Sequence, residues 1–212
     1  MSSNQSTRTT WSFVAVVIFS LIAIGINLLM TWHHDVQLYG LAEQGTLIGC
    51  ETSESVNCDA VNTSAYSVLF GVPIATWGIA AYALLALVSL SAARGSVAAR
   101  NGVLWMATLA VACSAFLFWV SVSELGFVCA WCLRLYVINA TVLSIAWFGG
   151  GRFVLPEMAF ARRTLATFAL LALVAVGGER TYRSSLLGAA GDIDLSAAES
   201  AVAAKSGAFI DP

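Results

Sequence analysis

Five stretches of nearly uninterrupted apolar residues divide the chain. They run over residues 11–31, 72–93, 103–122, 132–149 and about 160–178. A hydrocarbon core of about 30 Å, crossed at 1.5 Å per residue, needs roughly 20 apolar residues, which is close to the length of these stretches. The last stretch is the weakest, because Arg162 and Arg163 lie near its start and must snorkel to the interface. The pattern predicts five transmembrane helices.

The first apolar stretch, Trp11 to Thr31, is long for a cleaved targeting segment. Secretory signal peptides carry an apolar region of about 7–15 residues, followed by an Ala-x-Ala-like cleavage site. No such site precedes Trp32. We interpret the stretch as an uncleaved first helix.

Charge between the stretches indicates their orientation. Arginines flank one set of span ends, at positions Arg8, Arg94, Arg100, Arg152, Arg162 and Arg163. The long loop over residues 32–71 carries Asp35, Glu43, Glu51, Glu54 and Asp59 but no Lys or Arg. Since positive charge is enriched on the cytoplasmic side, we expect this loop to face the periplasm or an equivalent lumen.

Composition changes the picture only by excluding other classes. The chain of 212 residues is 59% hydrophobic and 10% charged, against roughly 45–50% and about 25% in soluble domains. Its net charge of −2, with no basic run, offers no footprint for nucleic acid. We expect an all-α membrane protein, with a helical bundle over residues 1–180 and an extracytoplasmic tail or linker over 181–212. Within that tail, residues 195–205 could form a short helix, but their Ala, Ser and Gly content favours a linker.

Four of the five cysteines fall on one side of the membrane in this topology. Cys50 and Cys58 lie in the acidic loop, and Cys129 and Cys132 lie where the third span has ended and the fourth begins. Disulfides persist in extracytoplasmic compartments. Cys113 lies in mid-span and is interpreted as a small hydrophobic residue.

The Cys129-x-x-Cys132 pair lies at the start of a predicted helix. Unsatisfied backbone N–H groups and the positive end of the helix dipole stabilise a thiolate there, which suits thiol–disulfide exchange. A structural zinc site is an alternative, although seven residues separate Cys50 from Cys58 and zinc knuckles are usually tighter. A second alternative is that the four cysteines form two inert structural disulfides, although a Cys-x-x-Cys disulfide closes a small ring that is typical of redox-active pairs. We favour exchange and expect no metal ion.

The order of these residues resembles the vitamin K epoxide reductase family, in its bacterial branch. The likeness covers about residues 11–150 and rests on Cys50-x7-Cys58, Ser64, Gly71-Val72-Pro73 with Gly78 and Tyr82, and Cys129-x-x-Cys132 followed by Tyr136. It implies a four-helix bundle around a quinone plus a fifth transmembrane helix. It also implies a multi-pass protein of the bacterial inner membrane, with its active site on the periplasmic side.

The resemblance assigns roles to individual residues. Cys50 is expected to exchange with a thioredoxin-like or DsbA-like partner, Cys58 to pass electrons to Cys129, and Cys132 to face a quinone of the ubiquinone or menaquinone type. Ser64 and Tyr136 take the positions of quinone-site residues in that family, with a helix cap and an interfacial aromatic as their other interpretations. Trp131 and Phe127 are further candidates for packing on the quinone ring, or for an interfacial aromatic belt.

The expected function is therefore a membrane thiol:quinone oxidoreductase that supports disulfide-bond formation. Vitamin K quinone or epoxide reduction is an alternative, but the amide that supports epoxide chemistry in the vertebrate enzyme has no counterpart in Pro73-Ile74-Ala75-Thr76. A non-catalytic scaffold or transporter with disulfide-stapled loops is a rival from another class. The nearest rival is another bacterial quinone-linked thiol oxidase, a four-helix protein. Its Cys-x-x-Cys lies in the first extracytoplasmic loop and its second cysteine pair in the later loop, which is the reverse of the order here. No further Cys-x-x-Cys follows Lys205, so we expect a separate partner or a chain that continues beyond Pro212.

Overall fold

Five long helices lie side by side in the structure, a computed structural model that describes residues 2–39, 49–50 and 52–191. They are α1 (Ser2–Tyr39), α3 (Ile74–Ala93), α4 (Val97–Val120), α5 (Ala130–Phe148) and α6 (Met158–Gly191). All five are long and apolar enough to cross a membrane. The prediction of an all-α membrane protein is confirmed. Glu43, Glu51 and the candidate helix over 195–205 lie outside the described residues.

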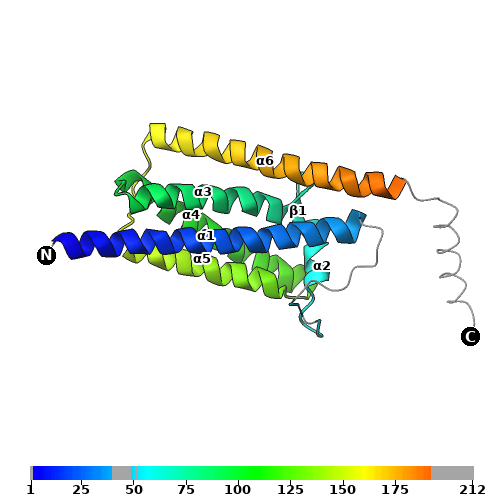
Figure 1. The fold of residues 1–212 in the computed structure, drawn as a ribbon. Coiled ribbons are helices and arrows are strands. Elements are labelled where there is room, and N and C mark those ends of the chain that lie inside the picture. Colours follow the sequence, from blue (N-terminus) through cyan, green and yellow to red (C-terminus); the bar gives the residue numbers. More distant parts are fainter. Residues whose placement is uncertain (1, 40–48, 51, 192–212) are drawn as a thin grey trace, which may run out of the picture.

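Successive long helices run in opposite directions, so their connections gather at two ends (Figure 1). The N-terminus of α1, the α3–α4 turn and the α5–α6 link lie at one end. The short elements lie at the other, which we call the cysteine end: α2 (Cys58–Asn62), η1 (Ala65–Ser67), the strands β1 (Val68–Leu69) and β2 (Val72–Pro73), and η2 (Ser121–Leu125). The candidate site residues predicted from the sequence therefore lie at this one end of the bundle.

Local sequence explains how elements at the cysteine end begin and end. β1 and β2 pair antiparallel, and the two residues between them, Phe70 and Gly71, both have positive φ, at 54° and 75°. That is the type I′ geometry that matches the twist of a tight hairpin. At the end of α4 one turn of π-helix, η2, is closed by Gly126 at a φ of 72°. Glycine takes this conformation without steric cost, and the chain then turns directly toward α5.

Close packing in the core depends on small residues and on polar bonds between helices. A Cβ atom at Gly78 would lie 2.3 Å from Oδ1 of Asn27, so α3 approaches α1 at this point only because residue 78 is glycine. The hydroxyl of Tyr82 donates to Oδ1 of Asn139 at 2.8 Å, and Nδ2 of Asn139 donates to Ser114 at 2.8 Å. These buried bonds connect α3, α5 and α4, as expected for helices in a bilayer.

Two helices continue past the C-terminal ends of the apolar stretches that predicted them. α1 continues beyond Thr31 to Tyr39, so His33, His34 and Asp35 lie on a helix rather than in the loop. α6 continues beyond residue 178 to Gly191, so residues 181–191, which we assigned to a tail, are helical. A search for apolar windows stops at charged residues. Here Asp35 and Arg183 form an ion pair with each other, and both helices continue past them.

Candidate functional site

Two chain segments that carry cysteines are joined by backbone hydrogen bonds. Val56 and Val128 form a parallel bridge, in which the N–H of Val128 donates to the carbonyl of Ser55 at 2.9 Å and the N–H of Asn57 donates to the carbonyl of Val128 at 3.1 Å. Cys58 follows Asn57 and Cys129 follows Val128. The bridge therefore brings a cysteine of the loop next to a cysteine of the Cys-x-x-Cys pair.

The loop cysteines form a disulfide, which we call the outer disulfide. Cys50 and Cys58 are bonded with their Cα atoms 6.2 Å apart, the pairing that the resemblance implies. Both residues are buried. Cys58 is the first residue of α2, whose N-cap Asn57 accepts a hydrogen bond from the N–H of Ala60 at 2.9 Å.

The extension of α1 holds α2, and with it the outer disulfide, in place. Nε2 of His33 lies 2.7 Å from a carboxylate oxygen of Asp59. Nδ1 of His34 donates to the carbonyl of Asn62 at 2.6 Å, and Nδ2 of Asn62 donates to the carbonyl of Met30 at 3.0 Å. Sequence analysis missed both histidines, although two consecutive polar rings directly after an apolar stretch were a visible signal.

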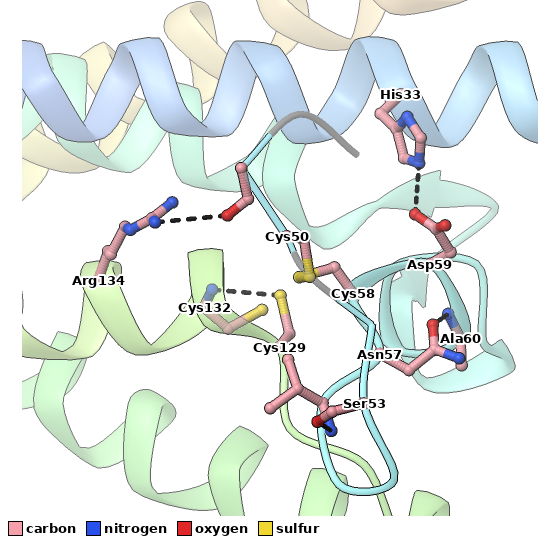
Figure 2. The surroundings of a disulfide bond; sticks show 12 residues. His33, Cys50, Ser53, Asn57, Cys58, Asp59, Ala60, Cys129, Cys132 and Arg134 are labelled. Atoms are coloured by element: carbon pink, nitrogen blue, oxygen red, sulfur yellow. Dashed lines mark hydrogen bonds and ion pairs between the residues drawn. A yellow bond between two sulfur atoms is a disulfide. The ribbon is translucent and has the colours of Figure 1, made fainter. Parts of the chain in front are cut away.

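Cys129 and Cys132, the inner pair, are free thiols. Cys129 is the N-cap of α5, and its Sγ accepts a 3.2 Å hydrogen bond from the backbone N–H of Cys132. Figure 2 shows the sulfur of Cys129 directed toward the outer disulfide. The predicted position of the pair at a helix N-terminus is thus the observed one.

The surroundings of Cys129 favour its thiolate. Its pKa is lowered, chiefly because the Cys132 side chain donates a hydrogen bond to it, and further by the N–H groups of Cys132 and Trp131 and by the positive charge of Arg134. Burial acts in the opposite direction. Hydrogen bonds to the thiolate outweigh the cost of its desolvation here. Cys129 is therefore a better leaving group, and more often a thiolate nucleophile, than an ordinary cysteine.

An apolar cavity lies on the other side of the inner pair. Its walls come from α1, the segment from α2 to α3, α4 with η2, and α5, through Asn27, Met30, Val61, Asn62, Ser64, Tyr66, Ser67, Ile74, Ala75, Leu117, Val120, Ser121, Leu125, Cys132, Leu135 and Tyr136. Of the four cysteines at this end, only Cys132 lines the cavity. The mostly apolar wall with a few polar groups is typical of small-molecule sites.

The polar groups of the cavity differ in what they offer a ligand. The hydroxyl of Ser64 donates to the carbonyl of Val61 at 2.9 Å, so its hydrogen is already used. The hydroxyl of Tyr136 makes no hydrogen bond within the described part of the chain, and its ring packs edge-on against Phe118. Ser64 precedes η1 without capping it through its side chain. The structure therefore brings both predicted residues to the cavity but leaves only Tyr136 with an unused donor.

The other two predicted ring-packing residues lie outside the cavity wall. The ring of Trp131 carries the guanidinium of Arg134 at 4.0 Å and faces Gly49, whose Cβ position would lie 3.4 Å from it. Phe127 accepts the hydroxyl of Ser121 through its backbone carbonyl. Trp131 thus supports the loop beside Cys50, and Phe127 helps to close η2.

Arg134 is a third residue that sequence analysis missed. Its guanidinium donates to the carbonyl of Gly49 at 3.4 Å, directly before Cys50 (Figure 2). It therefore connects the helix of the inner pair to the segment that carries Cys50 of the outer disulfide. Its position two residues after Cys132 was the available signal. Among the described residues, no group of three or more His, Cys, Asp or Glu could hold a metal ion.

Comparison with known proteins agrees with the motif order. The family model described as the vitamin K epoxide reductase family matches residues 14–147. That range contains α1 from Val14 onward, all four cysteines of the site and nearly the whole of α5, and it stops before α6. No curated protein matches the chain.

Proposed function

Because the chain belongs to the vitamin K epoxide reductase family, we propose that it oxidises a thioredoxin-like protein outside the cytoplasm and passes the electrons to a membrane quinone. Family membership by itself indicates a membrane thiol–quinone oxidoreductase. One observation carries the finer proposal. The inner pair lies between the outer disulfide and the cavity, with Cys129 directed to the first and Cys132 lining the second.

The first exchange takes place at the outer disulfide. A thiolate of the reduced partner attacks Cys50, the Cys50–Cys58 bond breaks, and Cys58 leaves as a thiolate. The partner's second thiolate then attacks the partner's first sulfur, which is bonded to Cys50, and releases Cys50 as a thiolate. The partner leaves oxidised, and two electrons remain on Cys50 and Cys58.

The second exchange transfers these electrons to the inner pair. The Cys58 thiolate attacks Cys129 of an oxidised Cys129–Cys132 disulfide, and Cys132 leaves as a thiolate. Cys50 then attacks Cys58, which restores the outer disulfide and releases Cys129. The arrangement described above, with the outer disulfide closed and both inner thiols free, corresponds to this stage.

The cavity fits a quinone head group. Its apolar wall suits the ring, and the free hydroxyl of Tyr136 suits a carbonyl oxygen. A quinone bound there would accept the two electrons of the inner pair, whose sulfurs would join again in the Cys129–Cys132 disulfide, and with two protons it would leave as a quinol. Cys132 would present its sulfur to the quinone, and the hydroxyl of Tyr136 would donate a hydrogen bond to one carbonyl oxygen. Ser64 contributes only if its hydroxyl turns away from Val61.

The proposed location is the inner membrane of a bacterium, with the cysteine end on the periplasmic side. At the opposite end, Arg94 follows the last residue of α3, Arg100 lies in the first turn of α4 and Arg152 lies in the α5–α6 link (Figure 1). Positive charge marks the cytoplasmic side. The outer disulfide then lies in the compartment where disulfides persist.

A coupled assay tests the proposal. The full chain in lipid nanodiscs is mixed with a reduced thioredoxin-like protein and decylubiquinone, and both quinone absorbance and partner thiols are followed. We expect one quinol per partner disulfide. Cys132→Ala should abolish quinol formation, and Cys113→Ala, at an exposed position on α4, should leave the rate unchanged. A scaffold with stapled loops gives no turnover with any variant, which contradicts the proposal.

A further inference from the structure

Three charged side chains meet where α6 crosses α1 at the cysteine end. Asp35 of α1 is fully buried, and Glu179 of α6 is nearly so. Arg183, one turn beyond Glu179, pairs with both, lying 3.9 Å from Asp35 and in direct contact with Glu179. The part of the chain matched by the family model stops before α6, and the proposed electron path uses none of the three residues.

Arg183 is the cation on which Asp35 depends. Neither carboxylate oxygen of Asp35 has a hydrogen-bond partner in the described part of the chain. A buried carboxylate without a counter-charge is strongly destabilising. The guanidinium also lies over the ring of Tyr39, 4.5 Å from its centroid. Most of α6 faces outward and its main contact is with α3, so this cluster is a polar anchor of α6 to α1.

The same arginine reaches a third element. Its Nη2 donates to the carbonyl of Gly71 at 3.5 Å. Gly71 is at the tip of the β1–β2 hairpin, and Figure 1 shows this hairpin extending to α6. The residue before the hairpin, Ser67, and the residue after it, Ile74, both line the cavity. A displacement of the hairpin therefore moves two parts of the cavity wall.

We propose that Arg183 is a positioning residue for the cavity, through which α6 holds the hairpin and thereby sets the affinity for the quinone. The hold of Arg183 on the hairpin follows from the contacts alone, whereas its effect on quinone affinity rests on the proposed function. Arg183 acts on the ligand only through the hairpin. Its loss should weaken quinone binding more than it slows the exchange steps at the cysteines.

The first test measures the hairpin directly by hydrogen–deuterium exchange of the full chain in nanodiscs. We compare wild type, Arg183→Met and, as a matched control, Arg180→Met, which changes an exposed arginine of the same helix. Backbone amides of residues 66–72 should exchange several-fold faster in Arg183→Met alone. Equal exchange in the two variants overturns the proposal.

The loss of Arg183 alone leaves two buried carboxylates without a cation, so Arg183→Met can fail to fold. The triple variant Asp35→Asn, Glu179→Gln, Arg183→Met removes all three charges as well as the hairpin contact. It should fold, as judged by thermal unfolding, and still show fast exchange in the hairpin. A triple variant that folds with wild-type exchange overturns the proposal.

The second test separates affinity from turnover. With decylubiquinone, Arg183→Met or the triple variant should raise the KM for the quinone about three- to tenfold, the equivalent of one lost hydrogen bond, with a smaller change in kcat. The KM for the thiol partner should not change, and Arg183→Lys should restore part of the affinity. Fast hairpin exchange with an unchanged quinone KM overturns the positioning role while the proposed function stands. If wild type reduces no quinone, the proposed function is wrong. The hydrogen–deuterium exchange data still show whether Arg183 holds the hairpin.

Discussion

The backbone N–H of Cys132 donates a hydrogen bond to Sγ of Cys129, so one inner cysteine supports the thiolate of the other. Cys129 accepts hydrogen bonds from the first turn of α5, where backbone N–H groups are otherwise unsatisfied. Cys132 lies three residues further on and faces the cavity. The two thiols of a short motif thus have different surroundings.

The lowered pKa of Cys129 predicts an asymmetric titration of the reduced inner pair. A lowered pKa means that the thiolate persists to lower pH than for an ordinary cysteine. Its largest cause is the hydrogen bond from the Cys132 side chain, so Cys132→Ala should move the titration of Cys129 to higher pH. Thiolate absorbance at 240 nm, followed against pH in the reduced protein, measures this. Cys113→Ala serves as control, and a midpoint shift in that variant, or none in Cys132→Ala, contradicts the assignment.

The connectivity of the relay predicts a trapped intermediate. In wild type Cys50 can attack Cys58 and resolve a bridge between Cys58 and Cys129, so that bridge is short-lived. Without Cys50 this exit is closed, and Cys50→Ala should accumulate the Cys58–Cys129 disulfide. Mass spectrometry of a non-reduced digest detects the cross-linked peptide. The double variant Cys50→Ala, Cys129→Ala should lack it, and a bridge from Cys58 to Cys132 instead would falsify the path.

The different states of the two cavity hydroxyls predict different mutational effects. Tyr136 has a free donor, whereas that of Ser64 is bound to Val61. Tyr136→Phe should lower kcat/KM for the quinone about tenfold, the cost of roughly one hydrogen bond, and Ser64→Ala less than about twofold. Steady-state kinetics with decylubiquinone check both values. A larger loss in the serine variant shows that its hydroxyl turns toward the ligand.

Close packing between α1 and α3 predicts a stability effect away from the cysteines. Gly78→Ala places a methyl group against Asn27 and should destabilise the protein by about 1–3 kcal/mol. Gly25→Ala is the matched control, because nothing lies within 4 Å of a Cβ atom at that position. It should be neutral or stabilising by up to about 1 kcal/mol, since alanine is the better helix former. Thermal unfolding in detergent compares the two, and equal effects contradict the packing argument.

The number of membrane crossings predicts the side on which α6 ends. With five spans and the arginine-rich connections in the cytoplasm, a reporter fused after Gly191 lies outside the cytoplasm. A reporter active only in the cytoplasm should therefore be silent there and active when inserted at Gly95, in the α3–α4 turn. Activity after Gly191 would mean that α6 does not span.

Hydrophobic pattern and composition predicted the transmembrane helices, because their position depends on the bilayer and not on contacts between distant segments. The five apolar stretches became helices because a bilayer requires it, and the Cys-x-x-Cys pair indicated a helix start because cysteine chemistry benefits there. Contacts between distant segments were outside the reach of these signals. The bond of His34 to Asn62 and that of Arg134 to Gly49 depend on how α1 and α5 meet the loop. Trp131 and Phe127 illustrate the same difficulty, because the sequence does not show whether an aromatic residue beside the Cys-x-x-Cys pair lies toward the cavity or away from it.

The bridge between Val56 and Val128 consists of backbone atoms only. The exposed side chains of Glu54 and Ser55 can therefore be replaced without loss of the bonds that join the two segments, whereas proline at 57 or 128 would remove a donor. The surface of this loop is thereby free to diverge. Descendants of the protein could adapt it to new redox partners, substitution by substitution, while the sulfur atoms keep their spacing.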